Sequence, residues 1–158
     1  MKNHIARRRF PVALALLPTL VAAAVLAGCS KVPDTLKIGV AQPLTGPLGA
    51  LGQDLLNGVN LAVQELNKDG FMVDGKRVKL EVVALDDKAD AATGKQVAQQ
   101  LVDAGVVAVI GHLNSGVSIE TAPIYAAKSI PQIAISTNPK FTQLGFDTSF
   151  RMVANDTL

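Results

Sequence analysis

Hydrophobic and polar residues recur with two different periods along the chain, and the changes of period mark alternating strands and helices. Residues 36–41 alternate with the period of two that a half-buried strand requires. From about residue 51 to residue 66 the apolar residues instead recur at helical spacing, and Asp69-Gly70 supplies a helix stop. The apolar positions of this helix are Leu55, Val59, Ala62, Val63 and Leu66. The pattern therefore predicts a strand followed by an amphipathic helix.

A second strand–helix unit follows the first. Asp74-Gly75 predicts a hairpin turn, and residues 78–85 form the next apolar strand. Asp90 is a suitable N-cap for a helix that ends at Gly105. The run at 106–110 is apolar at every position, which is typical of a strand buried on both faces in a parallel sheet covered by helices.

A third unit completes the predicted sheet. It contains a helix around Ile124, whose first turn Pro123 leaves unplaced, and strands at 132–136 and 149–153. Regular alternation of strands and helices predicts an α/β fold with a doubly wound, mostly parallel sheet. Ligands of such sheets bind outside the carboxyl ends of the strands, where the strand order reverses. We therefore expect the binding loops to start near Pro43, Asp86, Gly111 and Ser136.

The first 28 residues have the pattern of an export signal. Positive charges gather within residues 1–9, and residues 10–27 carry no charge. These 18 residues lie at the low end of a membrane-spanning length, which is about 20, and Pro18 would remove a backbone hydrogen bond that lipid cannot replace. The segment Leu26-Ala27-Gly28-Cys29 resembles the bacterial lipobox, which implies cleavage before Cys29 and lipidation of that cysteine. The alternative is an ordinary signal peptide cut near Cys29.

Composition narrows the possible partners. The 158 residues include 15 basic and 13 acidic side chains, but four of the basic ones precede residue 10 and every acidic one follows residue 33. The remainder is mildly acidic and has no clustered basic face, so we expect no nucleic-acid partner. One cysteine excludes an internal disulfide, and His4, Cys29 and His112 are the only soft metal ligands. We expect neither a metal site nor a cofactor.

Three features invite a catalytic interpretation, and each has a simpler one. The glycines from Gly46 to Gly52 have the spacing G-x-x-G-x-x-G rather than that of a dinucleotide loop, which favours a turn that lets the backbone approach a small ligand. His112 as a general base would need a carboxylate partner or a nucleophile, so a structural histidine bonded to nearby backbone is favoured. Asp86 and Asp87 are interpreted as turn and cap residues rather than as paired acids or a magnesium site.

Two hydroxyl clusters at strand ends are more informative. Asn114-Ser115-Gly116 lies between the apolar strand and a helix, where unpaired N–H groups, the Ser115 hydroxyl and the helix dipole suit a carboxylate. Ser136-Thr137 ends the neighbouring strand and offers hydroxyl and carbonyl acceptors that suit an ammonium group. Ordinary capping and turn formation explain the same residues equally well. A site with both features fits a zwitterion.

The ordered series of these motifs resembles the branched-chain amino-acid binding proteins, which are the periplasmic substrate-binding components of ABC importers of the type I, leucine-binding class. The motifs are Ile38-Gly39-Val40, Leu44-Thr45-Gly46-Pro47, Gly58 with Ala62, Leu85-Asp86-Asp87, and Ile110-Gly111-His112 with Ser115. The resemblance covers residues 36–158 and implies the first of two α/β lobes that close on a ligand. Relatives are more than twice as long, so we interpret the chain as an N-terminal portion that lacks the second lobe.

The resemblance also implies specific ligand contacts. Six positions are expected to bind the ligand: Leu51, Ser115, Gly116, Ile135, Ser136 and Thr137. In the family, the serine matching Ser115 and its neighbouring N–H groups bind the α-carboxylate. The residue matching Thr137 binds through its hydroxyl and N–H, and the carbonyl matching Ile135 receives the ammonium. Leu51 stands where some relatives place an aromatic pocket wall.

These features together predict an organisation and a function. Residues 1–28 are expected to be a lipoprotein signal peptide, 29–35 a tether, and 36–158 the N-terminal lobe. The expected protein is exported and lipid-anchored at Cys29, binds a branched-chain or related amino acid, and delivers it to the membrane permease of an ABC importer. It is not expected to be an enzyme. The alternative is a ligand-sensing receptor module of the same fold for amides or other small solutes.

Overall fold

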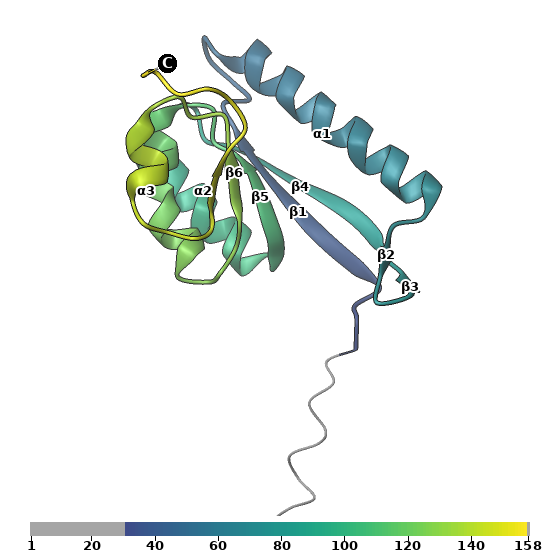
Figure 1. Cartoon of the computed structure of the whole chain (residues 1–158). Coiled ribbons are helices and arrows are strands. Elements are labelled where there is room, and N and C mark those ends of the chain that lie inside the picture. The colour runs from purple at the N-terminus through teal and green to yellow at the C-terminus, as the bar shows by residue number, and fades with distance from the viewer. Residues whose placement is uncertain (1–30, 158) are drawn as a thin grey trace, which may run out of the picture. The chain divides into compact units, whose positions relative to one another are not determined.

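A computed structural model describes residues 31–157, and its folded unit begins at Val32 (Figure 1). The predicted export signal and Cys29 lie outside the described residues. Within the described part, none of the helices combines the length and the apolar character that a membrane crossing needs.

A parallel sheet forms the centre of the folded unit. Its strands are β1 (Thr35–Gln42), β4 (Lys79–Asp86), β5 (Val106–Gly111), β6 (Gln132–Ala134) and β7 (Ser149–Arg151). The strand order is β4-β1-β5-β6-β7, and all four neighbouring pairs are parallel. The chain moves from β1 outward to β4 and then returns to the other side of β1, so the order reverses between β1 and β5. The predicted α/β class and parallel sheet are confirmed.

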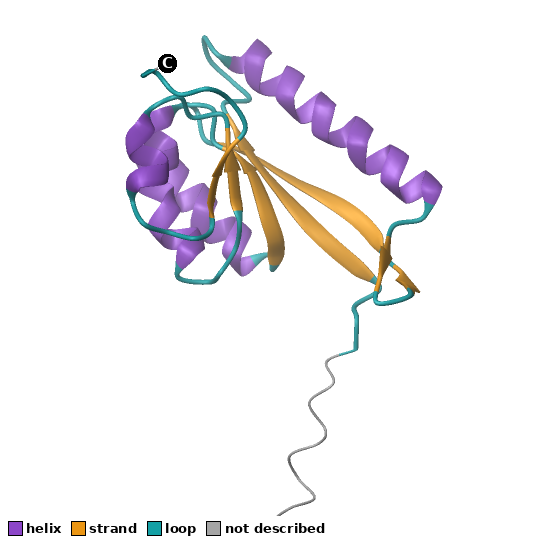
Figure 2. Ribbon diagram, in the orientation of Figure 1, coloured by secondary structure: helices purple, strands orange, loops and turns teal. Residues whose placement is uncertain are grey.

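Helices lie on both faces of this sheet (Figures 1 and 2). Helix α1 (Gly49–Asp69) covers one face, and helices α2 (Ala91–Asp103) and α3 (Ser115–Ala126) lie side by side on the other. The arrangement is that of a doubly wound fold, in which successive crossovers pass over opposite faces.

Local sequence signals set the ends of the first two helices. The Asp90 side chain accepts a hydrogen bond from the Thr93 backbone N–H at 2.7 Å, which caps the amino end of α2 as predicted. Gly70 ends α1 in the left-handed conformation, with φ of 91°, and its N–H donates to the Leu66 carbonyl. The predicted helix stop at Asp69-Gly70 is therefore confirmed.

The predicted hairpin is also present. Strands β2 (Met72–Val73) and β3 (Lys76–Arg77) pair antiparallel about Asp74 and Gly75. Both turn residues have positive φ, 48° and 77°, which matches the backbone twist that a two-residue hairpin favours.

The two faces of the sheet are packed differently. The face under α2 and α3 is closed by fully buried side chains, among them Ala98, Leu101, Val109 and Tyr125. Under α1, an apolar groove of about 500 Å³ remains. It is lined by Ile38, Leu55, Gly58, Val59, Ala62, Val63, Leu66, Phe71, Leu80, Ala108, Ile110 and Ile133.

The prediction that residues 106–110 are buried on both faces is therefore wrong. Val107 is 43% exposed, and Ala108 and Ile110 are only half-buried. The physical reason is that, among the described elements, α1 alone covers the face to which Ala108 and Ile110 contribute, and it leaves the groove open.

The last part of the chain differs in detail from the prediction. Strands β6 and β7 stop at Ala134 and Arg151, earlier than expected, because the chain turns into loops at that edge. A 3₁₀ helix, η1 (Pro139–Gln143), was not predicted. Its Phe141 is fully buried against Ala122 and Ala134, so the turn anchors the loop that follows β6.

Candidate functional site

The candidate site lies at the carboxyl edge of the parallel sheet. Strands β1, β4, β5 and β6 end at Gln42, Asp86, Gly111 and Ala134. The loops predicted to line a site therefore all leave the sheet from the same edge. The strand order reverses between β1 and β5, which is the position at which open α/β sheets bind ligands.

A hydrogen bond joins the first predicted hydroxyl cluster to the residue that follows the second. Ser115 is the first residue of α3, and its Oγ accepts from the backbone N–H of Asn138 at 3.3 Å. Asn138 directly follows Ser136-Thr137, in the loop after the neighbouring strand β6. The structure therefore brings together two segments that are 23 residues apart in the sequence. Because the Ser115 hydroxyl is the acceptor in this contact, its own proton remains available for donation.

The amino end of α3 has the character of an anion site. Asn114 occupies the N-cap position without a side-chain capping bond, and the first turn carries no acidic residue. The Asn114 Oδ1 atom is buried without a hydrogen-bond partner. Gly116 is exposed, and nothing lies within 4 Å of the position that a β-carbon would occupy. The first N–H groups of the helix and the Ser115 hydroxyl thus form a set of donors at the positive end of the helix dipole.

The β6 side of the site combines buried and exposed groups. Ser136 is fully buried and its Oγ lacks a hydrogen-bond partner, whereas Thr137 is exposed. Ile135 is half-buried just beyond the end of β6. The Thr137 carbonyl accepts from the Asp156 N–H at 2.9 Å, so this carbonyl is already engaged within the chain.

Leu51 belongs to α1 rather than to α3 or the loop after β6. It lies in the first turn of α1, on the face of the sheet opposite α3, and is 57% exposed. The contact that joins α3 to the loop after β6 does not include it. Its predicted role in the site therefore remains an expectation.

Two residues of the site were not found from the sequence. The Arg151 Nη1 donates to the carbonyls of Thr137 and Asn138, both at 3.2 Å, and its Nη2 contacts Thr142. The Asn138 side chain accepts from the Lys140 N–H at 2.9 Å and begins η1. An Asn-Pro pair is a recognised helix-start signal that could have located η1, but a single arginine in an edge strand resembles any solvent-facing charge.

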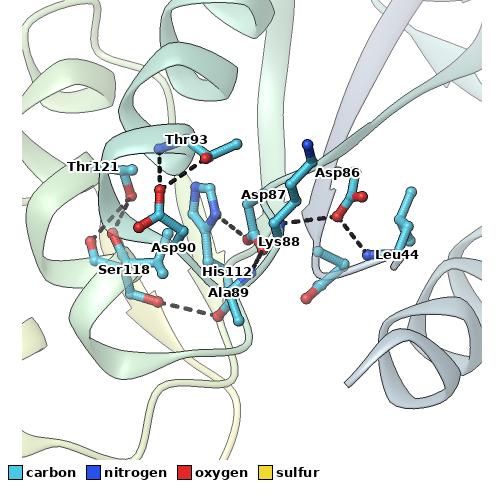
Figure 3. Close-up of polar contacts among 12 residues, drawn as sticks. Leu44, Asp86, Asp87, Lys88, Ala89, Asp90, Thr93, His112, Ser118 and Thr121 are labelled. Atoms are coloured by element: carbon cyan, nitrogen blue, oxygen red, sulfur yellow. Dashed lines mark hydrogen bonds and ion pairs between the residues drawn. The ribbon is translucent and has the colours of Figure 1, made fainter. Parts of the chain in front are cut away.

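Asp86 connects the loops after β1 and β4 (Figure 3). Its carboxylate accepts from the Leu44 N–H at 2.8 Å, the Thr45 hydroxyl at 2.5 Å and the Lys88 N–H at 2.9 Å. Burial alone would raise the pKa of Asp86, but these hydrogen bonds outweigh it and hold the pKa below its ordinary value. The predicted turn role is confirmed. The described residues include no group of three His, Cys, Asp or Glu side chains placed to hold a metal ion.

His112 is structural, but its partners differ from those predicted. It is fully buried, and its Nδ1 lies 2.6 Å from the Asp87 Oδ2 atom (Figure 3). Its Nε2 lies 3.2 Å from the Tyr125 hydroxyl. The prediction of a ring bonded to nearby backbone is therefore wrong, because both partners are side chains distant in the sequence. Asp87 and Tyr125 are also fully buried, so no external substrate reaches these three groups.

The glycine-rich turn is explained by the packing of the chain itself. Gly46 has a φ of 75°, which favours glycine, and its carbonyl accepts from the Gly49 N–H. A β-carbon on Gly52 would lie 2.1 Å from the Pro43 carbonyl oxygen, so glycine is required where α1 approaches the preceding loop. Neither requirement involves a ligand.

A reversal of strand order, a helix end without a side-chain cap and adjacent hydroxyl groups are features shared by α/β lobes that bind small solutes. The profile of the periplasmic binding protein family matches residues 35–157. The chain belongs to this family.

Individual relatives agree with this assignment. The Leu/Ile/Val-binding protein homolog 2 of Brucella abortus (strain 2308) is 44% identical over 120 residues, which cover 75% of this chain and 32% of the relative. A similar solved structure is LivJ from Streptococcus pneumoniae, a branched-chain amino acid transporter substrate binding protein in complex with isoleucine. It superposes with a TM-score of 0.70 and 34% identity, over 78% of this chain and 35% of LivJ. A second solved structure is a solute binding protein of an ABC transporter from Rhodopseudomonas palustris BisB5 in complex with 3,4-dihydroxybenzoic acid. It superposes with a TM-score of 0.65 and 26% identity, over 78% of this chain and 33% of that protein. The chain spans about a third of the length of the curated relatives it matches.

Proposed function

We propose that the full-length protein is the substrate-binding component of an ABC importer, which binds a branched-chain or related amino acid and delivers it to a membrane permease. The relatives described above are named as binding proteins, two of them of transporters, which supports a binding role. Because this chain spans only part of their length, its ligand and its permease partner are our proposals and are not taken directly from the relatives.

The contact between Ser115 and Asn138 carries the proposal. The donor end of α3 is bonded to the loop that contains Thr137, which supports a site where the opposite charges of one small molecule would both have partners. A carboxylate at the first N–H groups of α3 would accept from the Ser115 hydroxyl and interact favourably with the helix dipole. The ammonium of the same ligand would then face the carbonyl of Ile135 and the hydroxyl of Thr137.

The ligands of the relatives share one chemical group. Isoleucine and 3,4-dihydroxybenzoic acid, bound by the proteins described above, differ in size and in polarity, but both carry a carboxylate. In this chain, the carboxylate-binding end of α3 therefore fits either class. The ammonium contacts on the β6 side favour an amino acid.

We also propose the organisation of the whole chain. Residues 1–28 act as the lipoprotein signal peptide, residues 29–35 form the tether, and residues 36–158 form the first lobe of the binding protein. Lipid on Cys29 would hold the exported protein at a membrane surface. A Cys29→Ala variant is expected to leave the membrane fraction and to bind ligand as the wild type does. Membrane retention of this variant would contradict the lipid anchor.

Isothermal titration of the full-length gene product tests the ligand assignment. L-leucine, L-isoleucine and L-valine are expected to give saturable heats, and leucinamide, which lacks the carboxylate, is expected to bind much more weakly. 3,4-Dihydroxybenzoate serves as the carboxylate that lacks an ammonium group. Binding of dihydroxybenzoate without any amino acid would replace the amino-acid assignment with an aromatic-acid one. No heat with any of these compounds would reject the proposed ligand class.

A further inference from the structure

Three buried polar side chains lie beneath the candidate site. Asp87 follows β4, His112 follows β5, and Tyr125 lies in the last turn of α3, so each comes from a different element. All three have zero exposure. The His112 ring joins the other two, with 2.6 Å from its Nδ1 to the Asp87 carboxylate and 3.2 Å from its Nε2 to the Tyr125 hydroxyl (Figure 3 shows the first contact).

The chemistry of the three side chains determines which group donates and which accepts in each hydrogen bond. An ionised carboxylate only accepts, and the Asp87 carboxylate already accepts from the Ala89 N–H at 2.9 Å. We therefore assign the imidazole proton to Nδ1, which leaves Nε2 to accept from the Tyr125 O–H. Burial, and then the negative charge of Asp87, raise the pKa of Tyr125, so its hydroxyl stays protonated as a donor.

Two of these three side chains lie on either side of the proposed carboxylate site in the sequence. His112 lies three residues before Ser115 in the sequence, and Tyr125 lies ten residues after it. The His112 backbone carbonyl also accepts from the Ser118 hydroxyl at 3.1 Å, and Ser118 lies in the first turn of α3. The first turn of α3 is thus attached to His112 at one end, while Tyr125 attaches the end of the same helix to the same ring.

We propose that Asp87, His112 and Tyr125 act together as a positioning unit, which holds the first turn of α3 so that Ser115 and the N–H of Gly116 meet the ligand carboxylate. None of the three touches the ligand. Their effect passes through Ser115, which distinguishes the unit from residues that only stabilise the fold. The inference rests on the proposed function, because it assumes that a carboxylate binds at this helix end.

The variant Tyr125→Phe removes the hydroxyl that bonds to His112 while it keeps the aromatic ring. In the full-length gene product, we expect the affinity for L-leucine to fall by about 2- to 10-fold, the effect of one hydrogen bond. Leucinamide, which has no carboxylate, should lose less than about 2-fold. Gln99→Met is the control, since it removes one side-chain hydrogen bond of α2, to Asp103, and changes no contact of His112 or of the first turn of α3. It should not lower leucine affinity.

A double-mutant cycle separates positioning from general stability. If Tyr125 acts through Ser115, then Tyr125→Phe should change leucine affinity by less than about 2-fold when Ser115→Ala is already present. Equal losses in the two backgrounds would overturn the inference. So would an equal loss for leucinamide and leucine, because the unit would then act on more than the carboxylate.

A ligand-free measurement keeps the inference separate from the ligand assignment. Hydrogen exchange at the amides of residues 118–121, which are hydrogen-bonded within the first turns of α3, should accelerate in Tyr125→Phe and stay at the wild-type rate in Gln99→Met. If the wild type binds no leucine, the proposed function fails, and the exchange data still decide whether the unit holds the helix end. Unchanged exchange in Tyr125→Phe would overturn the positioning role.

Discussion

Two glycines on helices that cover opposite faces of the sheet provide a direct test of how those faces are packed. A β-carbon on Gly94 of α2 would lie 2.3 Å from the Val117 Cγ1 atom of α3, a distance that real β-carbons essentially never show. Val117 is 2% exposed, so it has little room to move. A β-carbon on Gly58 of α1 would meet nothing within 4 Å, because Gly58 lines the open groove.

The same substitution should therefore change stability in opposite directions. Replacing a helical glycine by alanine stabilises by roughly 0.5–1 kcal/mol when the site has room. Gly58→Ala should show this gain in the free energy of unfolding. Gly94→Ala has the same helix-propensity gain, but inserting a methyl group into a close-packed contact costs about 1–3 kcal/mol. We expect a net loss of about 1–2 kcal/mol for Gly94→Ala, and a gap of about 2 kcal/mol between the variants.

Urea denaturation followed by far-ultraviolet circular dichroism measures both effects. The midpoints should move in opposite directions while the slope of free energy against urea stays at the wild-type value, since neither change alters the surface exposed on unfolding. Stabilisation by both substitutions would refute the close approach of α2 and α3. Destabilisation by Gly58→Ala would refute the open groove under α1.

Three further predictions concern the site. Ser115→Ala should weaken leucine binding by about 1–3 kcal/mol, through loss of a hydrogen bond to a charged group, whereas Ser149→Ala at the opposite edge should not. Titration calorimetry would show this. Asp86→Ala should lower stability at pH 7 by about 1–3 kcal/mol. Because the folded pKa of Asp86 is lowered, this difference should be full above about pH 4 and disappear as the pH falls through the folded value, as acid unfolding curves would show. Arg151→Met should accelerate hydrogen exchange in the loop around Thr137.

Much of the fold follows from local signals in the sequence. Helices α1 and α2 are set by apolar spacing together with Asp90 and Gly70, which act within one turn of the helix ends. The starts of the loops at the carboxyl edge of the sheet were likewise predicted from the residues at which the strands end. These predictions succeed because the interactions that decide them lie within four residues of each other.

The parts that sequence reasoning missed depend on contacts between distant residues. Asp87 meets His112 across 25 residues of sequence, and Tyr125 meets it across 13. The local pattern predicts a turn at Asp87 and a structural His112, but it does not indicate which buried polar groups bond to one another. The exposure of Val107 was also missed, because the pairing of β5 with β1 shifts register at Val107 and an apolar run does not reveal such a shift.

Under the proposed function, the polar groups of this lobe determine the class of ligand but not the particular side chain. The end of α3, Ser115 and Thr137 would contact the carboxylate and ammonium that all α-amino acids share. Small-molecule sites bury most of the ligand surface, and selectivity among leucine, valine and an aromatic acid must come from the apolar walls that complete this burial. Leu51, the one predicted wall residue, is 57% exposed in the first turn of α1, the helix that follows the carboxyl-edge loop after β1. Substitution of Leu51 should therefore change the ranking of the ligands, whereas substitution of Ser115 should weaken all of the amino acids together.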